Sequence, residues 1–192
     1  MGFTRAELES YRDVSLPDLV GPEVKLLFTG INPSLWTAAT QTHFAHPGNR
    51  FWPALRRAGI IDRAFDLNRG MTDEDRAYLL SRGLGNTNLV NRATIRADEL
   101  TADELKAGRA RLEGLVARHR PQVVAIAGIT AYRMAFGRRA AVGGEQSEDL
   151  MGARLWVVPN PSGLNAHETI DSLAVAYAEP ARAAGVIPDL RA

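Results

Sequence analysis

The sequence contains no cysteine, and this absence removes several classes of chemistry at once. Disulfides, thiolate nucleophiles, iron–sulfur clusters and cysteine-ligated zinc all require that residue. Lysine is scarce as well, because only Lys25 and Lys106 stand beside 21 arginines. Arginine suits bidentate contacts to phosphate. A GC-rich genome explains the bias at least as well.

Long apolar runs are also missing. No stretch approaches the roughly 18 residues that a membrane-spanning helix needs, and residues 1–16 have no apolar core of signal-peptide length. We therefore expect a cytoplasmic protein without a membrane partner. The net charge of +1 excludes a histone-like polycation, so any contact with nucleic acid must come from local patches.

The length and the pattern of the chain predict its architecture. The 192 residues suit one domain, with residues 1–22 as an N-terminal helix and loop, and 45% hydrophobic residues can fill a sizeable core. Apolar strands alternate with helices, which predicts a three-layer α/β/α sandwich around a short, mostly parallel sheet of four or five strands. Strands are predicted at 24–29, 83–90, 122–128 and 154–159, and helices at 4–13, 49–60, 73–82, 101–119, 129–136 and 168–184.

Three other segments carry clear local signals. The helix at 101–119 has Thr101 as its cap, Glu104 at the capping-box position and an apolar stripe. Residues 30–48 are expected to form a loop, and the glycine-rich residues 137–153 an irregular hairpin.

Two of the predicted strands end in the same tripeptide. The first runs into Asn32-Pro33-Ser34, and the last runs into Asn160-Pro161-Ser162. Ligands of open parallel sheets bind outside the carboxyl ends of the strands. We therefore expect both segments to face one crevice.

Two side chains near the first tripeptide have two interpretations each. Asn32 can hold a water through its carbonyl oxygen, or the Asn-Pro pair simply turns the chain. Phe44 can stack on a planar ligand, or it anchors its loop in the core. Nearby arginines form a mild basic surface that suits phosphate but also fits a solvated helix face: Arg50, Arg56, Arg57, Arg63 and Arg69.

The second tripeptide leads into a loop with similar alternatives. Leu164 can project outward and wedge into a base stack, or it can turn inward. Ser162 with His167 suggests a small-molecule hydrolase, but the surrounding residues are not Gly-x-Ser-x-Gly. Neither Gly-x-Gly-x-x-Gly nor a Walker loop is present. His43 and His46 have metal-like spacing without an evident third ligand, so we expect no metal and no cofactor.

Taken together, the segments "GINPS" (30–34), "FAHPGNRFW" (44–52) and "NPSGL" (160–164) resemble the mismatch-specific uracil-DNA glycosylases, bacterial relatives of thymine-DNA glycosylase. The likeness runs from about residue 16 to 184 and includes "GNTNLVNRAT" and "ADELKAGRARL". It implies the uracil-DNA glycosylase sandwich fold and hydrolysis of the N-glycosidic bond of uracil.

The resemblance also implies roles for individual residues. Asn32 would position the attacking water, Phe44 would stack on the flipped base, backbone near Ile31 and Phe44 would bind that base, and Asn160 would help to close the pocket. Leu164 would fill the gap left by the flipped nucleotide, and backbone near Gly163 would read the widowed guanine. The expected DNA contacts are Ser34, Ser162, Gly163, Leu164 and Asn165.

The sequence departs from the family pattern in places. Ser34 replaces a glycine common in the first motif, residues 165–167 lack an arginine that relatives carry near position 166, and Asn88 stands where some relatives have lysine. Asp98 is the nearest carboxylate after loop 88–94. These departures leave the mismatch preference open.

The sequence therefore predicts a monofunctional, monomeric DNA N-glycosylase that excises uracil from G·U mismatches in double-stranded DNA. Such an enzyme would associate with the nucleoid by binding its DNA. Three alternatives remain open: a broader uracil glycosylase acting on A·U pairs or single strands, a non-catalytic lesion-binding module of the same fold, and the hydrolase built on Ser162 and His167.

Overall fold

The computed structural model describes residues 2–189, and its centre is one sheet of five strands in the order β2-β1-β3-β5-β4. Four strands are parallel to one another: β1 (Leu26–Gly30), β2 (Leu84–Asn88), β3 (Val123–Ala127) and β5 (Arg154–Val158). The two-residue β4 (Gly144–Glu145) pairs antiparallel with β5, so the hairpin expected within 137–153 extends beyond that segment. The predicted mostly parallel sheet is confirmed.

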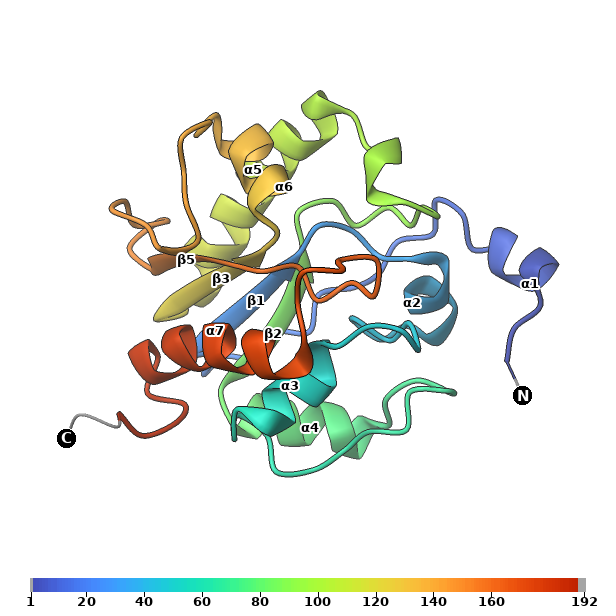
Figure 1. The fold of residues 1–192 in the computed structure, drawn as a ribbon, viewed down its shortest axis with the longest axis horizontal. Helices are drawn as coiled ribbons and strands as arrows, with labels where there is room; N and C mark the ends of the chain where they lie inside the picture. Colours follow the sequence, from blue (N-terminus) through green and yellow to red (C-terminus); the bar gives the residue numbers. More distant parts are fainter. Residues whose placement is uncertain (1, 190–192) are drawn as a thin grey trace.

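Helices cover both faces of the sheet, as Figure 1 shows. Because neighbouring strand residues point to opposite faces, Phe28 packs in the cluster with α3 (Phe51–Arg57), α4 (Asp73–Ser81) and α7 (Ile170–Ala183), whereas Leu27 packs in the cluster with α5 (Ala102–His119) and α6 (Ile129–Phe136). Both residues are fully buried or nearly so. The two faces therefore form two cores, and the predicted three-layer sandwich is confirmed.

The outer edge of β2 is covered by the N-terminal segment. The backbone N–H of Leu19 donates to the carbonyl of Asn86 at 2.9 Å, and the N–H of Asn86 donates back at 2.8 Å. This pairing protects an edge that would otherwise expose unpaired backbone groups. It also brings residues 17–20 close to the end of β2, where polar side chains of the candidate site lie.

Helix α5 forms as its sequence predicts. The hydroxyl of Thr101 accepts the N–H of Glu104, and the Glu104 carboxylate accepts the N–H of Thr101, which completes a capping box. The predicted apolar stripe is buried, at Leu105, Leu112, Leu115 and Val116.

Two predictions of local structure were wrong in part. A helix, α2 (Leu35–Thr40), lies inside the expected loop 30–48, because Ser34 caps it through the N–H of Thr37. Six residues are too few for an apolar period to stand out in the sequence. Helix α1 (Arg5–Glu9) ends well before residue 13, since Asp13 has a φ of 62° that no right-handed helix allows.

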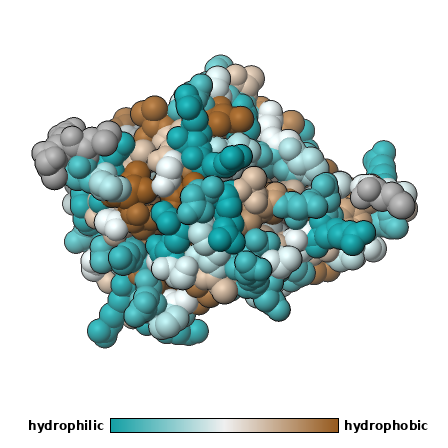
Figure 2. Space-filling model, turned by 90° about the horizontal axis from the view of Figure 1, so that it is seen from below, coloured by the Kyte–Doolittle hydropathy of each residue, from teal (hydrophilic) through white to brown (hydrophobic). Residues whose placement is uncertain are grey.

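The surface seen from below is mainly hydrophilic, and its apolar atoms form separate patches interrupted by polar side chains (Figure 2). Within residues 2–189, no helix is both long enough and apolar enough to span a bilayer.

Candidate functional site

The two Asn-Pro-Ser segments meet at the carboxyl edge of the sheet. Gly128 directly follows β3, and a Cβ placed on it would lie 3.2 Å from Cδ1 of Ile31 and 3.9 Å from Cβ of Asn160. The segment after β1 and the segment after β5 therefore approach each other across the end of β3. The two segments thus lie together at this edge, and a ligand crevice between them stays a prediction.

The side-chain amide of Asn32 has one chemically allowed orientation. Its Nδ2 donates to the Thr94 hydroxyl at 2.7 Å, to the Arg92 carbonyl at 3.1 Å and, more weakly, to the Pro33 carbonyl at 3.3 Å. Carbonyls cannot donate, and the Thr94 hydroxyl already donates its proton to the Arg96 carbonyl at 2.7 Å. Reversing the amide would place its oxygen against these acceptors, so Nδ2 must face them.

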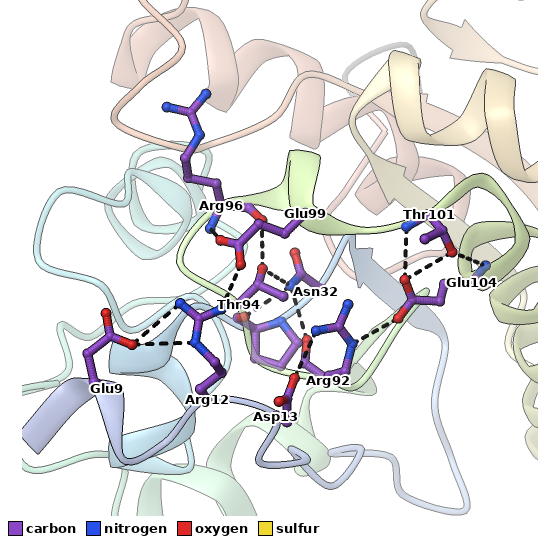
Figure 3. Close-up of polar contacts among 11 residues, drawn as sticks. Glu9, Arg12, Asp13, Asn32, Arg92, Thr94, Arg96, Glu99, Thr101 and Glu104 are labelled. Atoms are coloured by element: carbon purple, nitrogen blue, oxygen red, sulfur yellow. Dashed lines mark hydrogen bonds and ion pairs between the residues drawn. The ribbon is translucent and has the colours of Figure 1, made fainter.

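This orientation leaves the carbonyl oxygen of Asn32 available. Among residues 2–189, no donor contacts Oδ1, and Asn32 is only half-buried. Figure 3 shows the Asn32 side chain held on one side by Thr94 and by the backbone of the neighbouring segment. An oriented, unoccupied carbonyl oxygen is suited to accept a proton of a water molecule.

The segment after β2 fixes the first motif in place. The N–H groups of Leu89, Val90 and Thr94 donate to the carbonyls of Gly30, Ile31 and Pro33 at 2.8, 3.0 and 3.2 Å. The two segments therefore run side by side beyond the end of the sheet. Thr94 reaches Asn32 because of this pairing, although 62 positions separate them in the chain.

Arg92 anchors that segment to the rest of the protein. Its guanidinium contacts Asp13 and Glu104 at 2.8 Å each (Figure 3). Hydrogen bonds to these carboxylates raise the pKa of Arg92 above its usual value, and the bond from Arg92 lowers the pKa of Glu104 to about 2. Two distant parts of the chain, at Asp13 and Glu104, thus hold the backbone whose carbonyl orients Asn32.

Phe44 stands in a strained backbone conformation beside the end of β1. Its φ is 57°, which is rare for a bulky residue and costs of the order of 1–3 kcal/mol. One face of its ring stacks on buried Phe51, with centroids 3.9 Å apart and planes at 21°. Phe44 is half-buried, so it is both anchored to the core and partly accessible. The two interpretations of this residue are compatible.

A buried polar pair at the end of β2 was missed by the sequence reasoning. Asn88 is 4% exposed and His43 is 5% exposed. His43 Nε2 lies 3.1 Å from the Pro17 carbonyl, which can only accept, so Nε2 carries the proton. Nδ1 of His43 then accepts, and it lies 3.4 Å from Nδ2 of Asn88. The run Asn86-Thr87-Asn88 at a strand end was the signal, because such polar groups face the crevice or need buried partners.

Burial keeps His43 uncharged. It lowers the pKa of His43 from 6.5 to about 4, against the opposing effect of the Pro17 carbonyl. Below about pH 6.5 the unfolded chain gains a proton that the folded protein does not. The free energy of unfolding should therefore fall by about 2–3 kcal/mol between about pH 7 and about pH 4.5. Urea unfolding at both pH values measures it.

His43→Gln is the control for this prediction. Glutamine can donate to Pro17 and accept from Asn88, but it does not titrate. Between about pH 7 and about pH 4.5, the free energy of unfolding should fall less in the variant than in the wild type, by the roughly 2–3 kcal/mol assigned to His43. An equal loss in both proteins would show that other groups cause it.

The two histidines with metal-like spacing are engaged elsewhere. Both ring nitrogens of His43 have partners, and Nδ1 of His46 accepts the N–H of Gly48 at 3.0 Å. In the described part of the chain, no three His, Asp or Glu side chains gather in a group that could hold a metal ion.

The loop after β5 is organised by its own polar groups. Oδ1 of Asn160 accepts the N–H of Ser162 at 3.0 Å, Oγ of Ser162 accepts the N–H of Leu164 at 3.3 Å, and Nδ2 of Asn165 donates to the Asn160 carbonyl at 3.0 Å. Leu164 is 84% exposed, so the inward orientation does not occur. A Cβ on Gly163 would lie 2.6 Å from the Gly48 carbonyl, so only glycine fits there.

Other candidate residues have more limited roles in the structure. Ser34 uses its hydroxyl to cap α2, and its contact with DNA stays a prediction. Ser162 and His167 share no hydrogen bond within residues 2–189, which removes support for the hydrolase alternative. Asp98 pairs with Arg96 at 2.7 Å on the surface and does not contact Asn32.

Comparisons with known proteins agree with this architecture. The family model of the uracil DNA glycosylase superfamily matches residues 17–180. A solution NMR structure of a candidate uracil DNA glycosylase from Methanosarcina acetivorans superimposes with a TM-score of 0.58 at 16% sequence identity. The alignment covers 91% of this chain and 98% of that chain. At this identity, the likeness shows a shared fold.

Proposed function

The chain belongs to the uracil-DNA glycosylase superfamily, and we propose that it excises uracil from G·U mismatches in double-stranded DNA. The reaction is hydrolysis of the N-glycosidic bond, which releases uracil and leaves an abasic site. The observation that carries this proposal is the oriented carbonyl oxygen of Asn32 at the edge of the sheet where the two Asn-Pro-Ser segments meet. The finer likeness to the mismatch-specific enzymes rests on the residues of those motifs.

The proposed mechanism needs only weak activation of water. Uracil leaves as an anion, which hydrogen-bond donors stabilise, while the sugar becomes cation-like and reacts readily with a water molecule. The carbonyl oxygen of Asn32 holds that water. No carboxylate contacts Asn32 among residues 2–189, so general-base assistance of about 10²–10⁴-fold is not provided there.

The base would be held by one aromatic ring and by backbone and side-chain amide groups. Phe44 supplies a stacking face, and backbone near Ile31 and Phe44 supplies hydrogen bonds. Asn88 and Phe44 both lie beside Gly30, because Oδ1 of Asn88 and the Phe44 ring would be 2.5 and 3.3 Å from a Cβ placed there. The Asn88 amide can accept from N3–H and donate to O4 of uracil, which matches that edge of the base. Asn160 closes the pocket from the side of β5.

The loop after β5 would enter the duplex. Leu164 is exposed and apolar, so it can fill the space that a flipped nucleotide leaves. Backbone at Gly163 lies beside it and would read the opposing guanine, with further contacts from Ser34, Ser162 and Asn165. Flipping costs least at a mispaired base, which favours G·U over A·U.

The position of the lysines supports a monofunctional enzyme. A lyase step through a Schiff base needs an amine near the sugar. Lys25 directly precedes β1, at the edge of the sheet opposite to Asn32, and Lys106 pairs with Asp103 on α5. Lys25 is therefore remote from the proposed site, and the ammonium group of Lys106 is paired with Asp103 on the surface of α5.

Uracil release under single-turnover conditions tests the proposal. We expect the fastest release from an end-labelled G·U duplex and slower release from A·U and single-stranded substrates. Equal rates on all three would support the broader uracil glycosylase, which the altered residues 165–167 also suggest. Tight binding of the G·U duplex without release would contradict the enzyme and favour the lesion-binding module.

A further inference from the structure

Arg50 binds the loop after β5 through its backbone carbonyls. Its guanidinium donates to Ser162 at 2.6 Å, to Asn165 at 2.7 Å and to Glu168, and its backbone N–H donates to Pro161 at 3.0 Å. These four carbonyls are spread along residues 161–168. One residue at the start of α3 therefore contacts the loop from one end to the other.

These contacts do not fit an arginine whose donors are free to bind a DNA phosphate. Arg50 is half-buried, and within residues 2–189 no carboxylate forms an ion pair with it. Its Nη1 and Nη2 donate to carbonyls of the protein itself, whereas its buried Nε has no partner among residues 2–189. Arg50 therefore does not belong to a solvated helix face, and a contact of Arg50 with phosphate stays a prediction. Arginine is suited to this task because its five N–H groups lie in one rigid plane, which lysine cannot reproduce.

Leu164 adds almost no apolar burial to the loop, in which Pro161 is the one buried residue among residues 160–168. Leu164 is 84% exposed, so its side chain contributes little burial to the loop conformation. Polar contacts must preorganise the segment, and Arg50 makes those that link it to the body of the protein. The close approach of Gly163 to the Gly48 carbonyl follows from the same docking.

We propose that Arg50 is a positioning residue that holds loop 160–168 in the conformation that presents Leu164 to the duplex. This inference rests on the proposed function for the role of Leu164. Arg50 touches neither the base nor the water in this arrangement. It acts through the loop, and it determines how well the gap left by a flipped nucleotide is filled.

A double-mutant cycle tests the coupling. Arg50→Lys should slow single-turnover uracil release at sub-saturating enzyme by roughly 10- to 100-fold, because small displacements of a positioning group have effects of this size. In a Leu164→Ala background, Arg50→Lys should slow uracil release by less than about three-fold, because the side chain that Arg50 positions is absent. Additive effects would overturn the inference.

Two further readouts separate positioning from a phosphate contact. If Arg50 contacted a phosphate, lysine in its place would keep most of the DNA affinity. Arg50→Ala would then lower the number of ions released on DNA binding, measured from the salt dependence of the affinity, by about one. Positioning predicts no rescue by lysine and an unchanged salt dependence. The matched control is Arg57→Lys on the same helix, where an exposed arginine pairs with Asp171 at 2.7 Å. It should leave release unchanged.

Hydrogen exchange tests the role of Arg50 without relying on enzymatic activity. If the wild-type protein releases no uracil, that result contradicts the proposed function but not the contact between Arg50 and the loop. The amides of Ser162 and Leu164 donate within the loop. In Arg50→Lys they should exchange at least about ten-fold faster, while those of α7 and the melting temperature stay near wild type. Unchanged exchange in the loop would overturn the role of Arg50 directly.

Discussion

Asn32→Ala should slow single-turnover uracil release from a G·U duplex by roughly 10²- to 10³-fold, while the affinity for the duplex stays within about two-fold. The variant removes the carbonyl oxygen that we assign to the attacking water. It leaves the stacking ring of Phe44 and the loop that carries Leu164 in place. Release is measured on end-labelled DNA with saturating enzyme, and affinity is measured by titration of a labelled duplex.

Thr94 supplies the matched variants for this prediction. Thr94→Val keeps the shape of the side chain but removes the hydroxyl that accepts from Nδ2 of Asn32 at 2.7 Å. The amide then loses its strongest anchor, and we expect release to slow by about ten-fold. Thr94→Ser should restore most of the rate. If Asn32→Ala releases uracil as fast as the wild type, the glycosylase activity is supported but Asn32 does not hold the attacking water.

Gly30→Ala should cut uracil release by at least about 100-fold, because the added carbon has no room at the end of β1. It would lie 2.5 Å from Oδ1 of Asn88 and 3.3 Å from two ring carbons of Phe44. Asn88 is 4% exposed and lies beside His43, so it cannot simply turn outward. The Phe44 ring and the Asn88 amide, to which we assign stacking and base recognition, would therefore both be displaced.

The same substitution should lower the free energy of unfolding by about 1–3 kcal/mol, since it overpacks a buried site. Gly114→Ala is the control, because Gly114 lies on the exposed side of α5 with no atom within 4 Å of a new Cβ. That change should raise stability by up to about 1 kcal/mol and leave release unaffected. Unchanged release and stability in Gly30→Ala would mean that Asn88 and Phe44 do not lie where we describe them.

Most of the architecture followed from local pattern. The apolar runs at 122–128 and 154–159 are too short for buried helices and predict strands, and Thr101 with Glu104 marks the start of α5 without reference to any other part of the chain. Because strands that alternate with helices lie parallel, their ends fall at one edge. That reasoning was enough to bring the two Asn-Pro-Ser segments together. It was not enough for α2, whose six residues carry too short a pattern.

The candidate site shows the limit of such reasoning. Asn32, Phe44 and Leu164 could be singled out because motifs and residue types at strand ends carry them. Their partners could not be found in this way. Thr94 orients Asn32 across 62 positions, and Arg50 reaches the Asn165 carbonyl across 115. The sequence pattern alone assigned Arg50 to a basic surface and His43 to a weak metal pair.

The physical reason is the range of the interactions involved. Helix caps and strand burial depend on residues a few positions apart, so the order of side chains along the chain is sufficient to determine them. The orientation of an amide or the protonated nitrogen of a histidine depends on which donors and acceptors surround it in space. Those neighbours come together only when the segments after β1, β2 and β5 are folded against one another.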